Sequence, residues 1–255
     1  LKQWLGQIEQ AAAGSSAASY AAFRALAAEY AAKVSTTDPA KGGEVQTWWR
    51  DQLDGFVKKF PRSDEAPEAM LRLAVAQEFA GKDGEAEAKG VYEKLAAAFP
   101  GHPYKKKAEG AVRRLTSEGQ PFVLAGQTLE GKPFNFAQQA TKPTVVLYWA
   151  SWGNRTLDDL KQLAELAKTY GPKGLEVVTV SLDEDAAKAV QAINAAQLPG
   201  NHLFAPGGLD DSPLGVAYGI TMVPHLFLVS KDGKVVNRNA QTGPTLKDEI
   251  EKLVK

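Results

Sequence analysis

The stretch from Thr144 to Thr156 constrains the fold more than any other part of the chain. It reads T-V-V-L-Y-W-A-S-W-G-N-R-T, and its first half is a continuous apolar run rich in β-branched and aromatic residues. That composition is typical of a strand buried on both faces of a sheet. The second half is polar and leads directly into the amphipathic pattern D-D-L-K-Q-L-A-E-L-A-K-T-Y. The helix that follows therefore begins at the carboxyl edge of the sheet, where open α/β sheets usually carry their sites.

Two segments resemble the motifs of one family. Y-W-A-S-W-G-N-R-T resembles the Y-W-A-x-W-C-x-x-C segment of TlpA/ResA-like thiol–disulfide oxidoreductases, which are AhpC/TSA-type redoxins of the thioredoxin superfamily. Residues 218–236 resemble the cis-proline loop and the following hairpin of these proteins, with Val223, Pro224 and His225 in the loop. The resemblance covers residues 119–255, and the two motifs occur in the order of the family. It implies a thioredoxin fold, with a cis proline beside the motif and a backbone that pairs with an extended substrate.

The chain departs from the family at both cysteine positions of the motif. These positions are occupied by Gly153 and Thr156, with Trp152 before them and Asn154 and Arg155 between them, and the chain contains no cysteine. We call residues 152–156 the degenerate motif. Thiol–disulfide exchange needs a thiolate and two sulfurs that alternate between dithiol and disulfide. A peroxiredoxin-type mechanism also begins with a cysteine thiolate. The sequence therefore excludes the reaction of the family, and no catalytic residue is assigned.

Two classes of function remain open. The first is a redox-inactive thioredoxin-fold protein that binds a protein or an extended peptide. The second is an enzyme, either because the natural protein carries cysteines that this chain lacks, or because a hydroxyl chemistry replaced them. A hydroxyl of Ser151 or Thr156 near His225 would form a nucleophile–base pair, although no third orienting group is visible in the sequence. Glycine and threonine with Asn-Arg between them favour the first class, because engineered removal of cysteine generally uses serine or alanine.

The residues that replace the cysteine motif are good helix-capping residues. The side chains of Asn154 and Thr156 can accept bonds from backbone N–H groups that a helix leaves unpaired. Asp158 and Asp159 lie in the first turn, where the helix dipole favours carboxylates, so Thr156 and Asp159 are predicted to form a capping box. Arg155 lies where the dipole disfavours a cation and is expected to face solvent or a carboxylate. We therefore expect a segment rebuilt to begin a helix.

Residues 1–118 are predicted to form an all-helical domain. Apolar residues recur at helical spacing, and the breaks between the helices contain glycine or follow F-P, as at Phe60-Pro61 and Phe99-Pro100. Ala76, Phe79, Ala88, Tyr92 and Pro100 occur at the spacings of one tetratricopeptide-like hairpin, with A-G-K-D-G-E-A as its turn. The helical domain is either a bundle that packs on its neighbour or a module that binds a protein or peptide. Helices are predicted at residues 20–34, 45–60, 64–81, 84–99 and 103–117.

Residues 119–255 are predicted to form the thioredoxin-like domain. Two short extended segments around an L-E-G-K turn come first, and strands then alternate with helices before a final hairpin at K-D-G-K. Alternation with helices implies parallel pairing and the hairpin adds antiparallel strands, so the central sheet is expected to be mixed. The predicted strands are 144–149, 175–181, 202–205, 225–230 and 234–238, and the predicted helices are 154–170, 184–196, 211–218 and one from 245.

Composition narrows the partners. The 30 basic and 30 acidic residues cancel, so no broad attraction to nucleic acid is expected. No apolar run approaches the roughly 20 residues of a membrane span. The three histidines lack metal-ligand spacing and no nucleotide-binding motif is present, so neither a metal nor a cofactor is predicted. The chain begins with Leu1, which favours removal of a preceding segment, and the family resemblance implies an extracytoplasmic location. The partner and the oligomeric state are not indicated.

Overall fold

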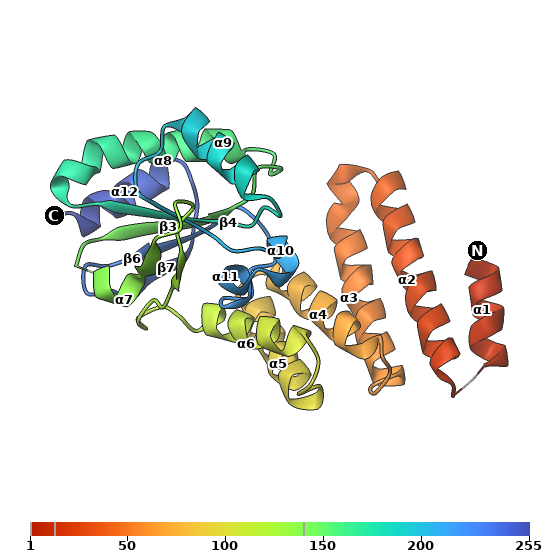
Figure 1. Cartoon of the computed structure of the whole chain (residues 1–255). Helices are drawn as coiled ribbons and strands as arrows, with labels where there is room; N and C mark the ends of the chain where they lie inside the picture. Colours follow the sequence, from red (N-terminus) through yellow and green to blue (C-terminus); the bar gives the residue numbers. More distant parts are fainter. Residues whose placement is uncertain (1, 13, 140) are drawn as a thin grey trace. The chain divides into compact units, whose positions relative to one another are not determined.

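The computed structural model describes residues 2–12, 14–139 and 141–255 (Figure 1). The chain divides into two compact units, residues 1–108 and 109–255. Helix α6, Tyr104–Leu115, begins in the first unit and ends in the second.

The first unit is helical, as the sequence predicts. Aromatic and leucine side chains form its core, and the rings of Tyr30 and Trp49 stack with their centroids 4.3 Å apart. Trp49 is buried and belongs to this core. Helix α1 has no counterpart among the predicted helices. The elements before α6 are α1 Lys2–Ala11, α2 Ser16–Thr36, a 3-10 turn Pro39–Lys41, α3 Gly42–Lys59, α4 Ala66–Glu78 and α5 Lys82–Ala98.

Helices α4 and α5 form the predicted hairpin, with a shorter turn than the sequence suggests. Helix α5 begins at Lys82, inside the segment A-G-K-D-G-E-A that we expected to be the turn. Between the two helices, the hydroxyl of Tyr92 donates a 2.6 Å hydrogen bond to Glu78 Oε1. The buried side chain of Tyr92 therefore both fills the space between the helices and ties them together.

The second unit contains a mixed five-stranded sheet in the order β5-β4-β3-β6-β7. Strand β3 pairs in parallel with β4 and antiparallel with β6, which gives the predicted mixture of directions. The strands of this sheet are β3 Thr144–Trp149, β4 Glu176–Ser181, β5 Asn201–Phe204, β6 His225–Val229 and β7 Val235–Ala240. A separate hairpin of β1 Ala125–Gln127 and β2 Pro133–Asn135 precedes it.

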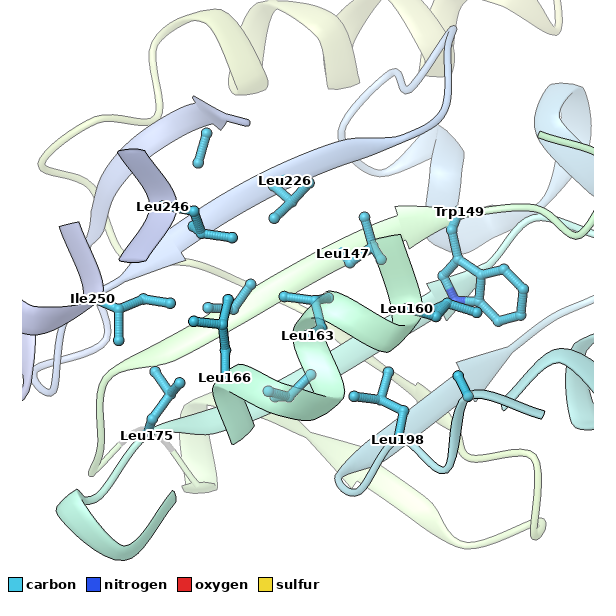
Figure 2. Close-up of a cluster of buried hydrophobic side chains, with 14 of the residues drawn as sticks. Leu147, Trp149, Leu160, Leu163, Leu166, Leu175, Leu198, Leu226, Leu246 and Ile250 are labelled. Atoms are coloured by element: carbon cyan, nitrogen blue, oxygen red, sulfur yellow. The ribbon is translucent and has the colours of Figure 1, made fainter. Parts of the chain in front are cut away.

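Helices α8, α9 and α12 lie together on one side of this sheet (Figure 1). Figure 2 shows Leu147 and Trp149 of β3 beside Leu160 and Leu163 of α8 in the buried cluster of this face. On the other face, Phe122 stacks on Tyr218 with a centroid separation of 4.9 Å. The remaining helices of this unit are α7 Phe136–Gln139, α8 Thr156–Tyr170, a 3-10 turn Gly171–Lys173, α9 Ala186–Ala196, α10 Gly208–Asp211, α11 Pro213–Val216 and α12 Pro244–Leu253.

The predicted fold class, an all-helical region followed by a thioredoxin-like domain with a mixed sheet, is confirmed. The single helix predicted over residues 211–218 is wrong. The chain forms two one-turn helices, α10 and α11, because Ser212 has non-helical dihedral angles and Pro213 has no N–H group to continue a helix.

Candidate binding site at the degenerate motif

The register of the sheet brings the two family motifs to one edge. Tyr148 of β3 lies opposite His225 of β6, and these strands are antiparallel. The residues after β3 and the residues before β6 therefore leave the sheet at the same end. The peptide bond between Val223 and Pro224 is cis.

Gly153 and Thr156 keep the spacing of a disulfide pair. A Cβ atom built at Gly153 would lie 3.9 Å from the Cβ atom of Thr156. Cβ atoms in disulfides are typically about 3.5–4.5 Å apart. The same atom would lie only 2.5 Å from Thr156 Oγ1, which donates a 2.6 Å hydrogen bond to the carbonyl of Ala150. The threonine hydroxyl thus fills the space beside the glycine, and the turn keeps its shape without sulfur.

The predicted capping arrangement is wrong. Helix α8 begins at Thr156, not at 154, and its N-cap is Arg155, for which no side-chain cap bond is formed among the described residues. Thr156 uses its hydroxyl on Ala150, as described above. Asp159 accepts a 2.7 Å hydrogen bond from the Thr242 hydroxyl instead of closing a capping box. The loop carbonyl of Ala150 and the distant hydroxyl of Thr242 have therefore taken the polar groups that a cap would use.

Asp183 is a site residue that sequence reasoning missed. Its buried carboxylate accepts hydrogen bonds from the backbone N–H of Ser151 at 2.9 Å and from the Ser151 hydroxyl at 2.7 Å. The Ser181 hydroxyl donates a third bond, at 2.9 Å. These donors satisfy a charge that would be costly to bury alone. The segment S-L-D at the end of β4 therefore fixes the loop that carries the motif. An acidic residue two positions after a buried strand was the available signal.

His225 does not have the environment of a general base. Burial, and after it the positive charge of Arg114, lower the pKa of its imidazole to about 3. Its Nε2 atom is buried and has no hydrogen-bond partner among the described residues. Both hydroxyls considered as nucleophiles are engaged elsewhere, Ser151 with Asp183 and Thr156 with Ala150. The hydroxyl-based pairing is therefore not formed.

The low pKa of His225 predicts a loss of stability in acid. The unfolded imidazole binds a proton below about pH 6.5 and the folded one does so only near pH 3, so stability falls as the pH falls through that window. We expect His225→Leu to remove about 2–3 kcal/mol of the loss between pH 7 and pH 4.5. Urea unfolding of both proteins at the two pH values measures it. Equal losses in the two proteins would contradict the assignment.

Several apolar side chains at this end of the sheet are exposed. Trp152 is 59% exposed, Leu157 42% and Met222 50%, and Pro224 is also exposed. Large apolar side chains gathered on a surface usually mark a site of interaction. The edge of the sheet thus presents an apolar rim, formed by Trp152, Leu157, Met222 and Pro224, around a motif without thiols.

Other kinds of site find little support in the described part of the chain. No three histidine, aspartate or glutamate side chains among those residues are grouped to hold a metal ion. Both ring nitrogens of His202 are engaged, Nδ1 with the Thr179 hydroxyl and Nε2 with the carbonyl of Leu198, each at 2.9 Å. None of the helices in the described ranges is long and apolar enough to cross a membrane.

Similar proteins are known for the second unit of the chain. Residues 115–254 match the Redoxin family. The thiol-disulfide oxidoreductase ResA of Bacillus anthracis is 27% identical over 143 residues, which are 56% of this chain and 78% of that protein. ResA of Bacillus thuringiensis subsp. konkukian is 25% identical over 141 residues, covering 54% and 78%. A solved thiol-disulfide oxidoreductase from Bacteroides fragilis is 24% identical with a TM-score of 0.47, covering 52% of this chain and 98% of that chain.

The fold and the motif edge define a thioredoxin-fold domain without the thiols of disulfide exchange. The chain belongs to the Redoxin family. It is related to thiol-disulfide oxidoreductases of the ResA type, and it has no cysteine with which to carry out their reaction.

Proposed function

We propose that this protein is a redox-inactive redoxin that binds an extended segment of a protein or peptide at the degenerate motif. The observation that carries the proposal is the apolar rim of Trp152, Leu157, Met222 and Pro224 around a motif that has lost both cysteines. If the domain had only lost its redox reaction, nothing would favour the exposure of these apolar side chains to solvent. Their exposure is instead what a peptide-binding surface requires.

The fixed backbone of the motif supports the same proposal. Asp183 holds Ser151, and Thr156 closes the turn onto Ala150, so the loop beneath the rim is ordered before any partner arrives. A preordered surface loses less conformational entropy on binding. The helical first unit supplies a second contact surface in this proposal. An extracytoplasmic location also belongs to the proposal, supported by the resemblance to TlpA/ResA-like proteins, and cell fractionation tests it.

Binding at the rim predicts a selective effect of Trp152. Reduced and carboxymethylated insulin B chain, labelled with fluorescein, serves as an extended probe without thiols. We expect Trp152→Ala to weaken the binding of this probe on the order of tenfold. An aromatic side chain that becomes buried on binding contributes more than about 1 kcal/mol to an interface. Fluorescence anisotropy of the full chain measures the dissociation constant.

A matched control distinguishes binding at the rim from nonspecific binding to exposed apolar side chains. Val236 on β7 is 48% exposed, so Val236→Ala removes a comparably accessible apolar side chain from another position. This variant should bind as the parent does. Equal weakening by the two substitutions, or no saturable binding at all, contradicts the proposal. Turnover above the buffer control in an insulin reduction assay would contradict redox inactivity.

A further inference from the structure

A second surface of the redoxin domain has the features of a peptide slot. A cavity of about 390 Å³ lies along residues 123–127, with residues 204–206 and the region of Leu214 and Ala217 as its other walls. All five consecutive residues from 123 to 127 line it. Because successive side chains of a strand point to opposite faces, a run of consecutive lining residues means that the cavity follows the edge of β1.

The slot opens where two strands diverge. Thr128, the residue after β1, forms an antiparallel bridge with Leu203 of β5, and Leu129 N–H donates a 2.7 Å hydrogen bond to the carbonyl of His202. Beyond this bridge, no other strand of the described ranges pairs with that edge of β1, since β1 and β2 form a sheet of two. The slot therefore lies between β1 and β5, which are joined at Thr128 and are unpaired toward Val123.

The free edge of β1 can pair with another chain. Phe136 N–H donates to the carbonyl of Leu124, and Thr128 N–H donates to the carbonyl of Lys132. The backbone groups of Leu124 and Thr128 therefore face β2. Main-chain polar groups alternate between the two edges of a strand, and the N–H and C=O of Ala125 therefore face the slot. An unpaired strand edge is a template for an added strand.

The open end of the slot carries one positive charge, that of Arg113, among the described residues that line it. Its Nη1 donates a 2.9 Å hydrogen bond to the carbonyl of Ala217, and the neighbouring Tyr218 hydroxyl accepts from Val123 N–H, so Arg113 lies at the Val123 end. Its guanidinium forms no ion pair with a carboxylate among the described residues, although it has five N–H groups to donate.

We propose that this slot binds an extended peptide that adds a strand to the edge of β1, packs apolar side chains against the walls and places an acidic side chain beside Arg113. A ligand with an acyl chain and a carboxylate would also place its charge beside Arg113 and its chain against the apolar walls of the slot. It would leave the N–H and C=O groups of Ala125 without hydrogen-bond partners. Strand addition satisfies those groups as well. The slot is distinct from the degenerate motif.

The test uses the full chain and a blocked probe peptide, acetyl-Glu-Val-Ser-Val-Ser-Val-Glu-amide, with glutamate at both ends so that either direction places a carboxylate near Arg113. We expect saturable changes in the amide NMR resonances of residues 123–127 and 204–206. Replacing both glutamates by lysine should weaken binding about fivefold or more, since a charge-assisted hydrogen bond is lost. Methylating alternate backbone nitrogens of the probe should abolish strand addition.

Three variants complete the test. Arg113→Gln should weaken the glutamate probe about fivefold and leave the lysine probe unchanged, whereas Arg113→Lys keeps the charge and most of the affinity. Ala125→Pro removes the edge donor without touching the β1–β2 ladder and should weaken both probes about fivefold. Trp152→Ala should leave slot binding unchanged, which separates this inference from the proposed function.

Several outcomes overturn the inference. They are parent-like binding by both Arg113→Gln and Ala125→Pro, resonance changes that avoid the slot, and equal binding of the methylated probe. Occupation by decanoate with displacement of the peptide assigns the slot to acyl ligands instead. Self-association through the β1 edge, detected by sedimentation and blocked by Ala125→Pro, assigns it to a second copy of this chain.

Discussion

Introducing cysteine at both positions, Gly153→Cys with Thr156→Cys, should produce an intramolecular disulfide and measurable, weak reductase activity. The backbone need not move to form this bond, because the 3.9 Å between the two Cβ positions lies within the usual range of about 3.5–4.5 Å. The first thiol would lie just before α8, where the positive end of the helix dipole lowers thiol pKa values. Asp158 and Asp159 in the first turn oppose this effect, so the activity should be weak.

Thiol titration before and after mild oxidation measures disulfide formation, and insulin reduction measures turnover. The control Gly153→Ser with Thr156→Ser is similar in size and has no sulfur, and it should show neither. Gly153→Cys alone should be crowded, since its Cβ would lie 2.5 Å from Thr156 Oγ1. Two persistently free thiols in the folded double variant would show that the geometry of the exchange site is lost.

Gly110→Ala should destabilise the redoxin domain by about 3 kcal/mol, the upper range for overpacking, because backbone atoms cannot move aside as a side chain can. Gly110 lies in α6, and an added Cβ would be 2.1 Å from the carbonyl oxygen of Val216 and 2.5 Å from the nitrogen of Gly219. The helix therefore packs directly on the backbone after α11. Arg114, also in α6, donates a 3.1 Å hydrogen bond from Nε to the carbonyl oxygen of Tyr218, which lies in the same segment after α11.

Gly90→Ala is the matched control. Gly90 also lies inside a helix, α5, but an added Cβ meets nothing within 4 Å. Alanine should therefore stabilise that helix by about 0.5–1 kcal/mol. Hydrogen exchange of amides in β3 and β4 reports the stability of the redoxin domain separately. Unchanged exchange in Gly110→Ala would contradict the direct packing.

The elements that could be predicted are those with strong local patterns. The β-branched run of β3 and the K-D-G-K turn indicate a strand and a hairpin through local composition alone. The order of the two family motifs then leads to the thioredoxin fold. The helix expected over residues 211–218 is interrupted at Ser212, because Pro213 has no N–H group with which to continue α10.

The candidate site was predictable in position and not in its contacts. The sequence by itself determined that no thiol chemistry is available, since the chain has no cysteine, and that the motif lies at the carboxyl edge of β3. Only the tertiary structure decided that Thr156 bonds to Ala150 and that Asp183 holds Ser151. It likewise decided that β1 and β5 part beyond Thr128 to leave a slot. The physical reason is that a hydroxyl, a carboxylate or a strand edge takes whichever partner the folded chain brings within hydrogen-bond distance, and that distance is not encoded in local periodicity.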